Sequence, residues 1–221
     1  MKREFLTTGD GSITIHLPEW NEQYHSKHGA IAEAKHVFIK HGLHYVQDLV
    51  STKPISILEI GFGTGLNAFL TFLEAHKSSI PIMYTGIEAY PVSLHEINQL
   101  NYANELNASK DIFLNFHLTE WGTLSNICTN FQLIKRQQFF SEINDIDQYQ
   151  LIYFDAFGAR VQPELWTEAI FSKMYHALSS EGVLVTYSAK GSVRRAMQAV
   201  GFTVSRLPGP PGKREMLRAV K

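Results

Sequence analysis

The middle of the chain alternates short apolar runs with longer segments of helical periodicity. The runs are "ISILEI" (55–60), "IMYTGIEAY" (82–90), "FQLIKRQ" (131–137), "YQLIYFDAF" (149–157) and "GVLVTYS" (182–188). Their β-branched and aromatic residues predict buried strands. Segments 66–76, 93–105 and 163–178 predict helices. This alternation predicts an α/β fold in which a mainly parallel sheet lies between two layers of helices.

The two ends of the chain carry other patterns. Near the N-terminus, "SITIHL" alternates polar and apolar positions after a turn at Gly9–Gly11 and predicts a strand or hairpin. Helices are expected from about Ile31 to Lys40 and again after Gly42, through Leu49. After a helical pattern in "SVRRAMQAVGF", the segment "FTVSRLPGPPGKREMLRAV" predicts two strands joined by a Pro/Gly-rich loop. The last strand is then antiparallel to its predecessor.

A mainly parallel sheet that ends in such a hairpin resembles the Rossmann-like class I S-adenosylmethionine-dependent methyltransferases. We therefore expect a small N-terminal extension, residues 1–50, packed on a methyltransferase domain of residues 51–221. A chain of 221 residues that is 44% hydrophobic suits this size of core.

Composition favours the cytoplasm. The sequence has no signal-peptide pattern and no run of about 18 apolar residues, so no membrane association is expected. Cys128 is the single cysteine, which excludes an internal disulfide and favours a reducing compartment. Beside the apolar Ile127 it is interpreted as a packed free thiol.

Basic residues are concentrated near the C-terminus. The formal net charge is −1, yet residues 182–221 hold eight lysines and arginines against one acid, a local charge of +7, and the rest of the chain sums to −8. This asymmetry favours a polyanionic partner, although α/β domains also carry basic faces without such a role. The candidates for phosphate contacts are Lys190, Arg194, Arg195, Lys213 and Arg214.

The glycine-rich stretch "EIGFGTGLN" predicts a cofactor loop. Gly61, Gly63 and Gly65 follow the first strand of the central pattern with G-x-G-x-G spacing. A dinucleotide fingerprint needs G-x-G-x-x-G, and no G-K-[ST] of a phosphate-binding P-loop follows. Glu59 would repel a pyrophosphate and attract a sulfonium or amino group. Asn67, which closes the stretch, is a further cofactor-binding candidate.

Glu88 strengthens this interpretation. It lies in the next strand, "IMYTGIEAY", at the position where a carboxylate accepts both ribose hydroxyls of an adenosine cofactor. NAD(H) and S-adenosylmethionine share that half of the molecule. The glycine spacing favours S-adenosylmethionine.

Further motifs resemble one methyltransferase family. "DAFGARVQPELW" (155–166) and "KREML" (213–217), together with "EIGFGTGLN", "HGAIAEAKHVFI" and "GSVRRAMQAVGF", are similar to the methyltransferase domain of the bifunctional tRNA 5-methylaminomethyl-2-thiouridine biosynthesis enzymes. The resemblance runs from about Tyr24 to the C-terminus. The FAD-dependent oxidase domain of those enzymes has no counterpart here. We therefore expect a free-standing methyltransferase form without FAD.

The resemblance implies an activity and a set of site residues. The activity is transfer of a methyl group from S-adenosylmethionine to the aminomethyl nitrogen of 5-aminomethyl(-2-thio)uridine at wobble position 34 of tRNA. The resemblance places the three glycines, Glu59 and Glu88 on the cofactor, and Asp155 beside the amine. The family usually has Gly-Asp after the strand "FQLIK", whereas this chain has Arg136–Gln137. A Gln137 carbonyl can still accept a hydrogen bond from the adenine amino group.

The chemistry is consistent with these residues. Methyl transfer to nitrogen needs the amine held in line with the sulfonium, and it needs neither a metal nor a covalent nucleophile. An alkylamine has a pKa of about 10, so it is mostly protonated at neutral pH. Asp155, at the end of the strand "YQLIYFD", can orient the amine and offset its developing charge. With an ordinary pKa of about 4 it is expected to be a weak proton acceptor. A purely structural role as a helix N-cap is the alternative.

Other functions remain open at this point. A small-molecule N-methyltransferase or a polyamine aminopropyltransferase shares the fold and an acid-lined amine site, and the basic C-terminal segment counts against both. A non-catalytic adenosyl-binding or RNA-binding module is disfavoured by Asp155 beside a full cofactor loop. The histidines, including His36, His41 and His44, show no strong metal-ligand pattern. No required protein partner is evident.

Overall fold

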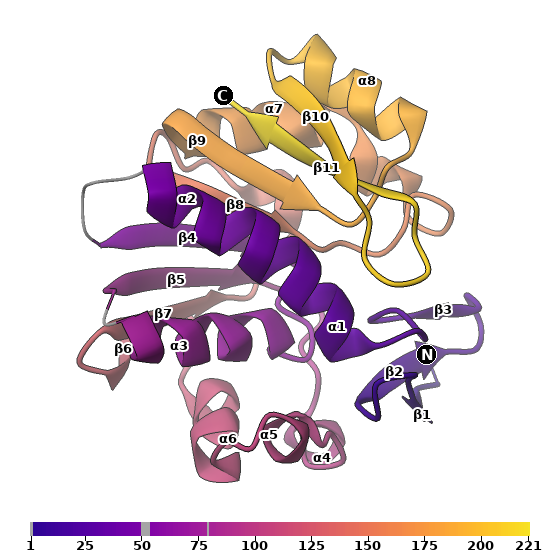
Figure 1. Ribbon diagram of the computed structural model, residues 1–221, viewed down its shortest axis with the longest axis vertical. Coiled ribbons are helices and arrows are strands. Elements are labelled where there is room, and N and C mark those ends of the chain that lie inside the picture. Colours follow the sequence, from indigo (N-terminus) through magenta and orange to yellow (C-terminus); the bar gives the residue numbers. More distant parts are fainter. Residues whose placement is uncertain (1, 50–53, 79) are drawn as a thin grey trace.

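The computed structural model describes residues 2–49, 54–78 and 80–221, and its centre is an eight-stranded sheet (Figure 1). The order of the strands is β10-β11-β9-β8-β4-β5-β7-β6. The strands are β4 (Ile55–Ile60), β5 (Ile82–Ile87), β6 (Ser125–Cys128), β7 (Phe131–Arg136), β8 (Tyr149–Phe154), β9 (Leu178–Thr186), β10 (Thr203–Pro208) and β11 (Glu215–Val220).

The directions of the strands agree with the methyltransferase-like layout. β4 pairs in parallel with β5 and β8, and β7 and β9 extend the parallel part on the two sides. β11 is antiparallel to both β9 and β10, so the terminal hairpin inserts its last strand between them. The predicted antiparallel C-terminal strand is confirmed. The parallel strands therefore end together at one edge of the sheet, where a ligand site is expected.

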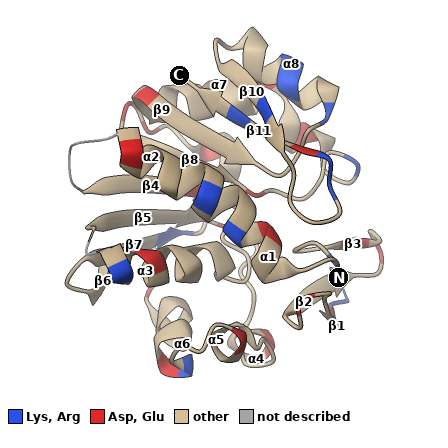
Figure 2. Cartoon of the chain, in the orientation of Figure 1, with Lys and Arg blue, Asp and Glu red and all other residues tan. Residues whose placement is uncertain are grey.

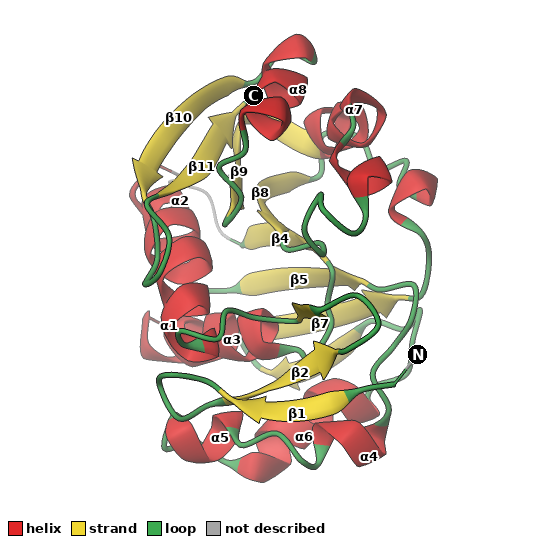
Figure 3. Cartoon of the chain, turned by 90° about the vertical axis from the view of Figure 1, so that its right-hand side faces the viewer, coloured by secondary structure: helices red, strands yellow, loops and turns green. Residues whose placement is uncertain are grey.

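Helices cover both faces of the sheet (Figure 3). One face carries a long helix formed by α1 (Ala30–Ala34), the π-helical η1 (Lys35–Leu43) and α2 (His44–Leu49), beside α3 (Leu66–Ser78). Phe38 and Phe69 of these helices share one apolar core with Tyr84 and Tyr153 of the sheet. The other face carries α7 (Glu168–Ala177) and α8 (Gly191–Ala199), preceded by the short 3-10 turn η3 (Pro163–Trp166).

The helix at 30–49 differs from the prediction, which placed a break at Gly42. The helix continues because Gly42 faces the sheet, where a Cβ would lie 3.0 Å from Val185 and 3.1 Å from Tyr153. Glycine here allows close packing of the helix on the sheet rather than a turn. The predicted domain boundary adjoins residues 50–53, which lie outside the described residues. Residues 30–49 share the core of the sheet.

The region after β5 also differs from the prediction of one helix at 93–105. The chain forms α4 (Leu94–Ile97) and α5 (Tyr102–Glu105), then α6 (Lys110–Leu118), which was not predicted, and β6 follows as a short edge strand. Asn101 interrupts the helix because its side chain binds the N-terminal segment. Its Oδ1 accepts the Ile13 N–H (2.8 Å), and its Nδ2 donates to the Gly11 carbonyl (2.9 Å).

The predicted N-terminal hairpin is part of a small antiparallel sheet. β1 (Glu4–Thr7), β2 (Ile13–Leu17) and β3 (Glu22–Gln23) pair in that order. This sheet lies at the edge where β4 and β5 end (Figure 1). It therefore covers the carboxyl ends of the parallel strands.

Candidate active site

The chain turns sharply where β4 meets α3. Gly61, Gly63 and Gly65 have φ values of +91°, +49° and +72°, a region that residues with a Cβ avoid. A Cβ at Gly61 would also lie 2.7 Å from the carbonyl oxygen of Asp155. The glycines thus bring bare backbone to the end of the central parallel strand, beside the loop that follows β8.

Two carboxylates share one amide at this turn. Asn67, in the first turn of α3, donates from Nδ2 to Glu59 Oε1 (2.9 Å) and to Asp155 Oδ2 (2.8 Å). Glu59 is 1% exposed. Burial raises its pKa well above the usual range, and the charge of Asp155 adds to this while the Asn67 hydrogen bond opposes it. Asn67 therefore links the glycine turn to the loop after β8.

An unpaired acceptor at this link indicates what a ligand can bring. Within the described part of the chain, Asn67 Oδ1 is buried without a hydrogen-bond partner, and Asn67 lines the cavity at this edge of the sheet. An amide oxygen is an acceptor, so a ligand that donates from an ammonium or hydroxyl group would satisfy it. The methionine end of S-adenosylmethionine carries such an ammonium group, and a pyrophosphate offers no donor. The residues present fit S-adenosylmethionine.

Glu88 follows β5 and lies beside the glycine turn. Its Oε2 accepts the Gly63 N–H (3.0 Å), and its Oε1 accepts the Tyr90 N–H (2.9 Å). Each carboxylate oxygen has a second lone pair, and Glu88 lines the cavity at this edge of the sheet. The residue can hold the turn and still accept ligand hydroxyls.

Asp155 lines the same cavity directly after β8. Burial, with the nearby charge of Glu33, raises the pKa of Asp155 to about 7, although the Asn67 hydrogen bond and the charge of Lys213 act in the opposite direction. The expected ordinary pKa of about 4 is therefore wrong for this environment. The next helical element begins only at Pro163, so Asp155 caps no helix.

A partly buried ion pair lines the same cavity as Asp155. Glu33 of α1 pairs with Lys213 of the loop between β10 and β11. The Lys213 ammonium also lies 3.9 Å from the centre of the Tyr187 ring. The Tyr187 hydroxyl donates to the Ala156 carbonyl (2.8 Å), next to Asp155. Residues from three distant segments thus surround one carboxylate.

Aromatic side chains form the remaining wall. The Tyr24 ring, just after β3, meets the Phe157 ring edge-on with 4.9 Å between centroids, and Trp20 meets Phe157 at 5.8 Å. Arg160 holds the two loops together, because its Nη2 donates to the carbonyls of Trp20 (3.0 Å) and Asn21 (2.8 Å). The N-terminal sheet is therefore fastened to the loop that carries Asp155.

These groups line one cavity of about 1290 Å³. Pockets for a single small ligand usually measure about 300–1,000 Å³. The cavity therefore has room for a second molecule beside a cofactor on the glycine turn.

Most predicted cofactor residues are gathered here. Gly61, Gly63, Asn67 and Glu88 line the cavity, and the buried Glu59 and Gly65 belong to the same turn. Gln137 follows β7 at an exposed position and is not among the cavity-lining residues. Its contact with an adenine stays a prediction.

The predicted basic residues fall into two groups. Lys190 and Lys213 line the cavity, but Lys213 is engaged by Glu33. Arg194 and Arg195 lie on α8, and Arg214 is exposed in the hairpin loop. Among the ion pairs of residues 2–49, 54–78 and 80–221, none involves Lys190, Arg194, Arg195 or Arg214.

Several lining residues were not singled out from the sequence. Glu33 and Tyr187 stand inside the quoted motifs "HGAIAEAKHVFI" and "GVLVTYS", but periodicity alone assigns them to a helix and a strand. His25 lines the cavity too, and burial lowers its pKa to about 4, which keeps it neutral. Within the described ranges, no group of three His, Cys, Asp or Glu side chains is placed to hold a metal ion.

The family comparison agrees with this geometry. Residues 118–221 match the model of a family described as S-adenosyl-L-methionine-dependent methyltransferase. The whole fold is similar to the crystal structure of MNMC2 from Aquifex aeolicus, with a TM-score of 0.77 and 22% identity over 99% of this chain and 69% of that one. It is also similar to spermidine synthase from Thermotoga maritima, with a TM-score of 0.58 and 16% identity over 99% of this chain and 68% of that one.

The fold and the glycine turn with its acidic partners are those of the class I S-adenosylmethionine-dependent methyltransferase fold, and residues 118–221 match a family model of that description. Among sequence relatives, the chain is similar to the tRNA 5-methylaminomethyl-2-thiouridine biosynthesis bifunctional protein MnmC of Hydrogenovibrio crunogenus, with 27% identity over 89% of this chain and 31% of that protein. The protein of the same name from Idiomarina loihiensis is 28% identical over 90% of this chain and 35% of its own length. The chain thus spans about a third of these curated relatives and corresponds to their methyltransferase part.

Proposed function

We propose that this enzyme methylates the aminomethyl nitrogen of 5-aminomethyl(-2-thio)uridine at wobble position 34 of tRNA. The product is 5-methylaminomethyl(-2-thio)uridine. The observation that carries the proposal is the placement of Asp155. Its carboxylate accepts a hydrogen bond from Asn67 of the cofactor turn. It also lines a cavity with aromatic walls that is large enough for a second substrate. Similarity to the bifunctional relatives supports the choice of acceptor.

Asp155 suits an amine acceptor in two ways. The charged carboxylate attracts the protonated amine into the cavity and accepts its hydrogen bond. With a pKa raised to about 7, it can also take the proton that the nitrogen must lose, since a proton acceptor works best with a pKa near the working pH. S-adenosylmethionine, when bound, supplies the methyl group, and its sulfur keeps the electron pair of the broken bond. The proton on Asp155 then passes to solvent.

The aromatic wall suits a nucleobase that leaves its stack. Enzymes that modify a base within folded nucleic acid extrude it into a pocket, where it stacks on aromatic side chains. Trp20, Tyr24 and Phe157 offer such surfaces beside Asp155. A free polyamine has no ring to stack, which favours the nucleotide over the aminopropyltransferase alternative.

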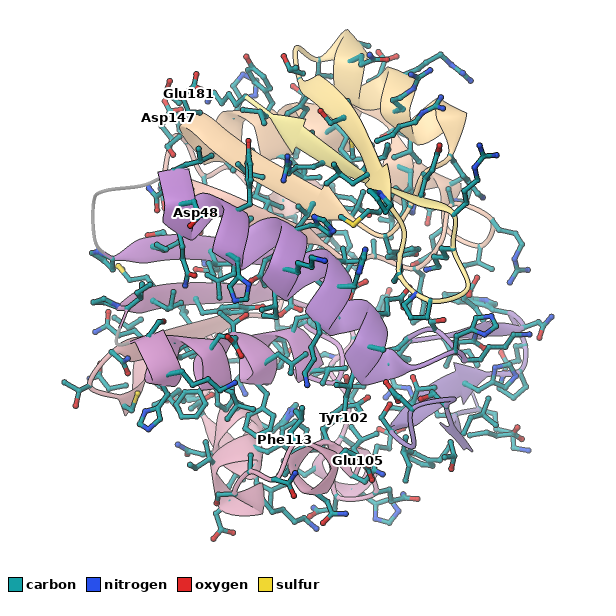
Figure 4. The ribbon with its side chains drawn as sticks, viewed as in Figure 1. Asp48, Tyr102, Glu105, Phe113, Asp147 and Glu181 are labelled. Carbon is teal, nitrogen blue, oxygen red and sulfur yellow. The ribbon has the colours of Figure 1, made fainter. Side chains whose placement is uncertain are left out.

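Basic residues lie beside the cavity, whose own lining also carries acidic side chains such as Glu22, Glu88 and Glu164. Lys190 and the hairpin loop lie near its mouth, and α8 carries further basic residues (Figure 2). Asp48, Asp147 and Glu181 lie at the opposite end of the sheet (Figure 4). Exposed basic residues without acidic partners can bind backbone phosphates. A tRNA substrate implies a cytoplasmic enzyme, and no helix in the described part of the chain is long and apolar enough to cross a membrane.

The test is direct. The protein is incubated with S-adenosylmethionine labelled on the methyl group and with tRNA from cells that lack the modification. The tRNA is then digested and its nucleosides are identified. Label in 5-methylaminomethyl(-2-thio)uridine is the expected result. Label in another nucleoside, or transfer only to free amines, would refute the proposed substrate.

A further inference from the structure

Glu33 has been given no part in cofactor binding or in methyl transfer. It is 7% exposed and belongs to the N-terminal helix α1. One carboxylate oxygen, Oε2, accepts the Ser26 N–H (2.9 Å), and the other pairs with the Lys213 ammonium. The pair joins two segments that lie 180 residues apart in the sequence. A buried carboxylate at this place needs an explanation, because burying a charge is costly.

The charges of both members of this pair affect the pKa of Asp155. The charge of Glu33 raises the pKa of Asp155, and the charge of Lys213 lowers it. The other titratable groups that face Asp155 come from β4, β5, α5 and the end of β9. They are Glu59, Tyr84, Tyr102 and Tyr187. Lys213 is the cation whose charge lowers the Asp155 pKa.

We propose that Glu33 is a positioning residue for methyl transfer, which holds Lys213 against Tyr187 and keeps the Asp155 carboxylate available to the substrate amine. The proposal rests on the proposed role of Asp155. An ammonium released from Glu33 would compete with the amine for Asp155, because both are cationic donors seeking one carboxylate. It would also make Asp155 a weaker proton acceptor.

A purely structural ion pair makes a different prediction. If Glu33 and Lys213 only fasten the N-terminal helix to the hairpin loop, their charges still act on the Asp155 pKa, but each does so independently of the other. If Glu33 acts on Asp155 by holding Lys213, Glu33→Gln lowers the Asp155 pKa further when Lys213 is present to be released than when Lys213 has been replaced by Met. Glu33→Gln removes a negative charge and frees the cation, so the Asp155 pKa falls. Lys213→Met leaves Glu33 unpaired, so it rises.

The experiment is a carbon-13 NMR titration of the aspartate carboxyl groups in the purified chain, with Asp155→Asn to assign the signal. Glu33→Gln is expected to lower the Asp155 pKa by about one to two pH units, and Lys213→Met to raise it. The decisive comparison is the shift that Glu33→Gln causes in the Lys213→Met background, which is expected to be smaller than the shift that it causes in the wild-type background. The matched control is Glu22→Gln, because Glu22 also lines the cavity but pairs with Arg160.

Equal shifts from Glu33→Gln in the wild-type and Lys213→Met backgrounds would overturn the proposal, as would an unchanged Asp155 titration in Glu33→Gln. If Glu33→Gln does not fold, Glu33→Asp keeps the negative charge on a shorter side chain that holds Lys213 less well, and an Asp155 pKa equal to that of wild type would then overturn the proposal. The titration needs no RNA, so its outcome is independent of whether the chain methylates tRNA. With substrate present, the acid limb of the kcat/KM profile is expected to move to lower pH in Glu33→Gln. The same profile as wild type would contradict the link to catalysis.

Discussion

The two halves of the cavity are held together in different ways. The cofactor half (Glu59, Gly61, Gly63, Gly65, Asn67 and Glu88) lies within 30 residues of sequence and depends on backbone conformation, with positive φ at each glycine. The acceptor half (Tyr24, Glu33, Asp155, Tyr187 and Lys213) joins four distant segments through side-chain contacts. The first half is formed mostly by one contiguous stretch and is completed by Glu88 after the next strand, whereas the second is assembled by contacts between distant segments. We therefore expect substitutions in the two halves to have separable effects.

The largest expected effect comes from removing the charge of Asp155, which should impair the acceptor half and spare the cofactor half. Asp155→Asn retains the shape and can still accept the Asn67 hydrogen bond, but it removes the negative charge beside the amine. We expect kcat to fall on the order of 10²–10³-fold, as for loss of one preorganised electrostatic group. Cofactor affinity, measured by calorimetry, should change little. Near-normal turnover on tRNA would show that Asp155 is only structural.

The reverse experiment is made in the cofactor half. Glu88→Ala removes a carboxylate that accepts the Gly63 N–H and faces the cavity. Each hydrogen bond to a charged group is worth about 1.5–3 kcal/mol, so affinity for S-adenosylmethionine should fall at least about tenfold. Glu88→Gln, which keeps acceptor oxygen, should lose less. Equal affinity of Glu88→Ala and wild type in calorimetry would refute the ribose contact.

The acceptor half should also titrate near neutrality. Methyl transfer should increase with pH through about 7 as Asp155 loses its proton.

Stability should change in the opposite sense. The folded-state pKa lies above the ordinary value of 3.8, so the folded chain binds more protons between these values and the contribution of Asp155 to stability is lost as pH rises. Urea unfolding of wild type and Asp155→Asn at pH 4, 5.5 and 7.5 gives the difference in their free energies of unfolding. As pH rises, this difference should become less favourable to wild type. A constant difference would contradict the raised pKa.

The smallest expected effect lies outside both halves. Arg194→Ala with Arg195→Ala removes two cations from α8 and leaves its buried Val193 and Met197 in place. If these arginines bind phosphates, tRNA affinity should fall and the slope of log K against log salt should flatten by roughly 0.7–0.9 for each lost contact. Cofactor affinity serves as the control. Superimposable salt titrations would place the RNA surface elsewhere.

The cofactor half could be predicted from the sequence because its residues are contiguous and its φ values require glycine. Asp155 could also be placed, since the ends of parallel strands meet at one edge of a sheet. Glu33 and Tyr187 could not, because no local pattern shows which residues a fold brings together across the chain. The raised pKa of Asp155 was missed for the same reason. The break at Asn101 was hidden as well, since its cause is a hydrogen bond to the N-terminal sheet.

The Glu33–Lys213 pair also sets an order of events during protein synthesis. The two residues are 180 positions apart, and a ribosome adds roughly 5–20 residues per second. Lys213 is therefore synthesised roughly 10–40 s after Glu33, and after the glycine turn has been made. The cofactor turn needs Glu88 and Asp155 for its hydrogen bonds. The amine site needs the C-terminal hairpin as well, so it can be completed only after that hairpin has been made.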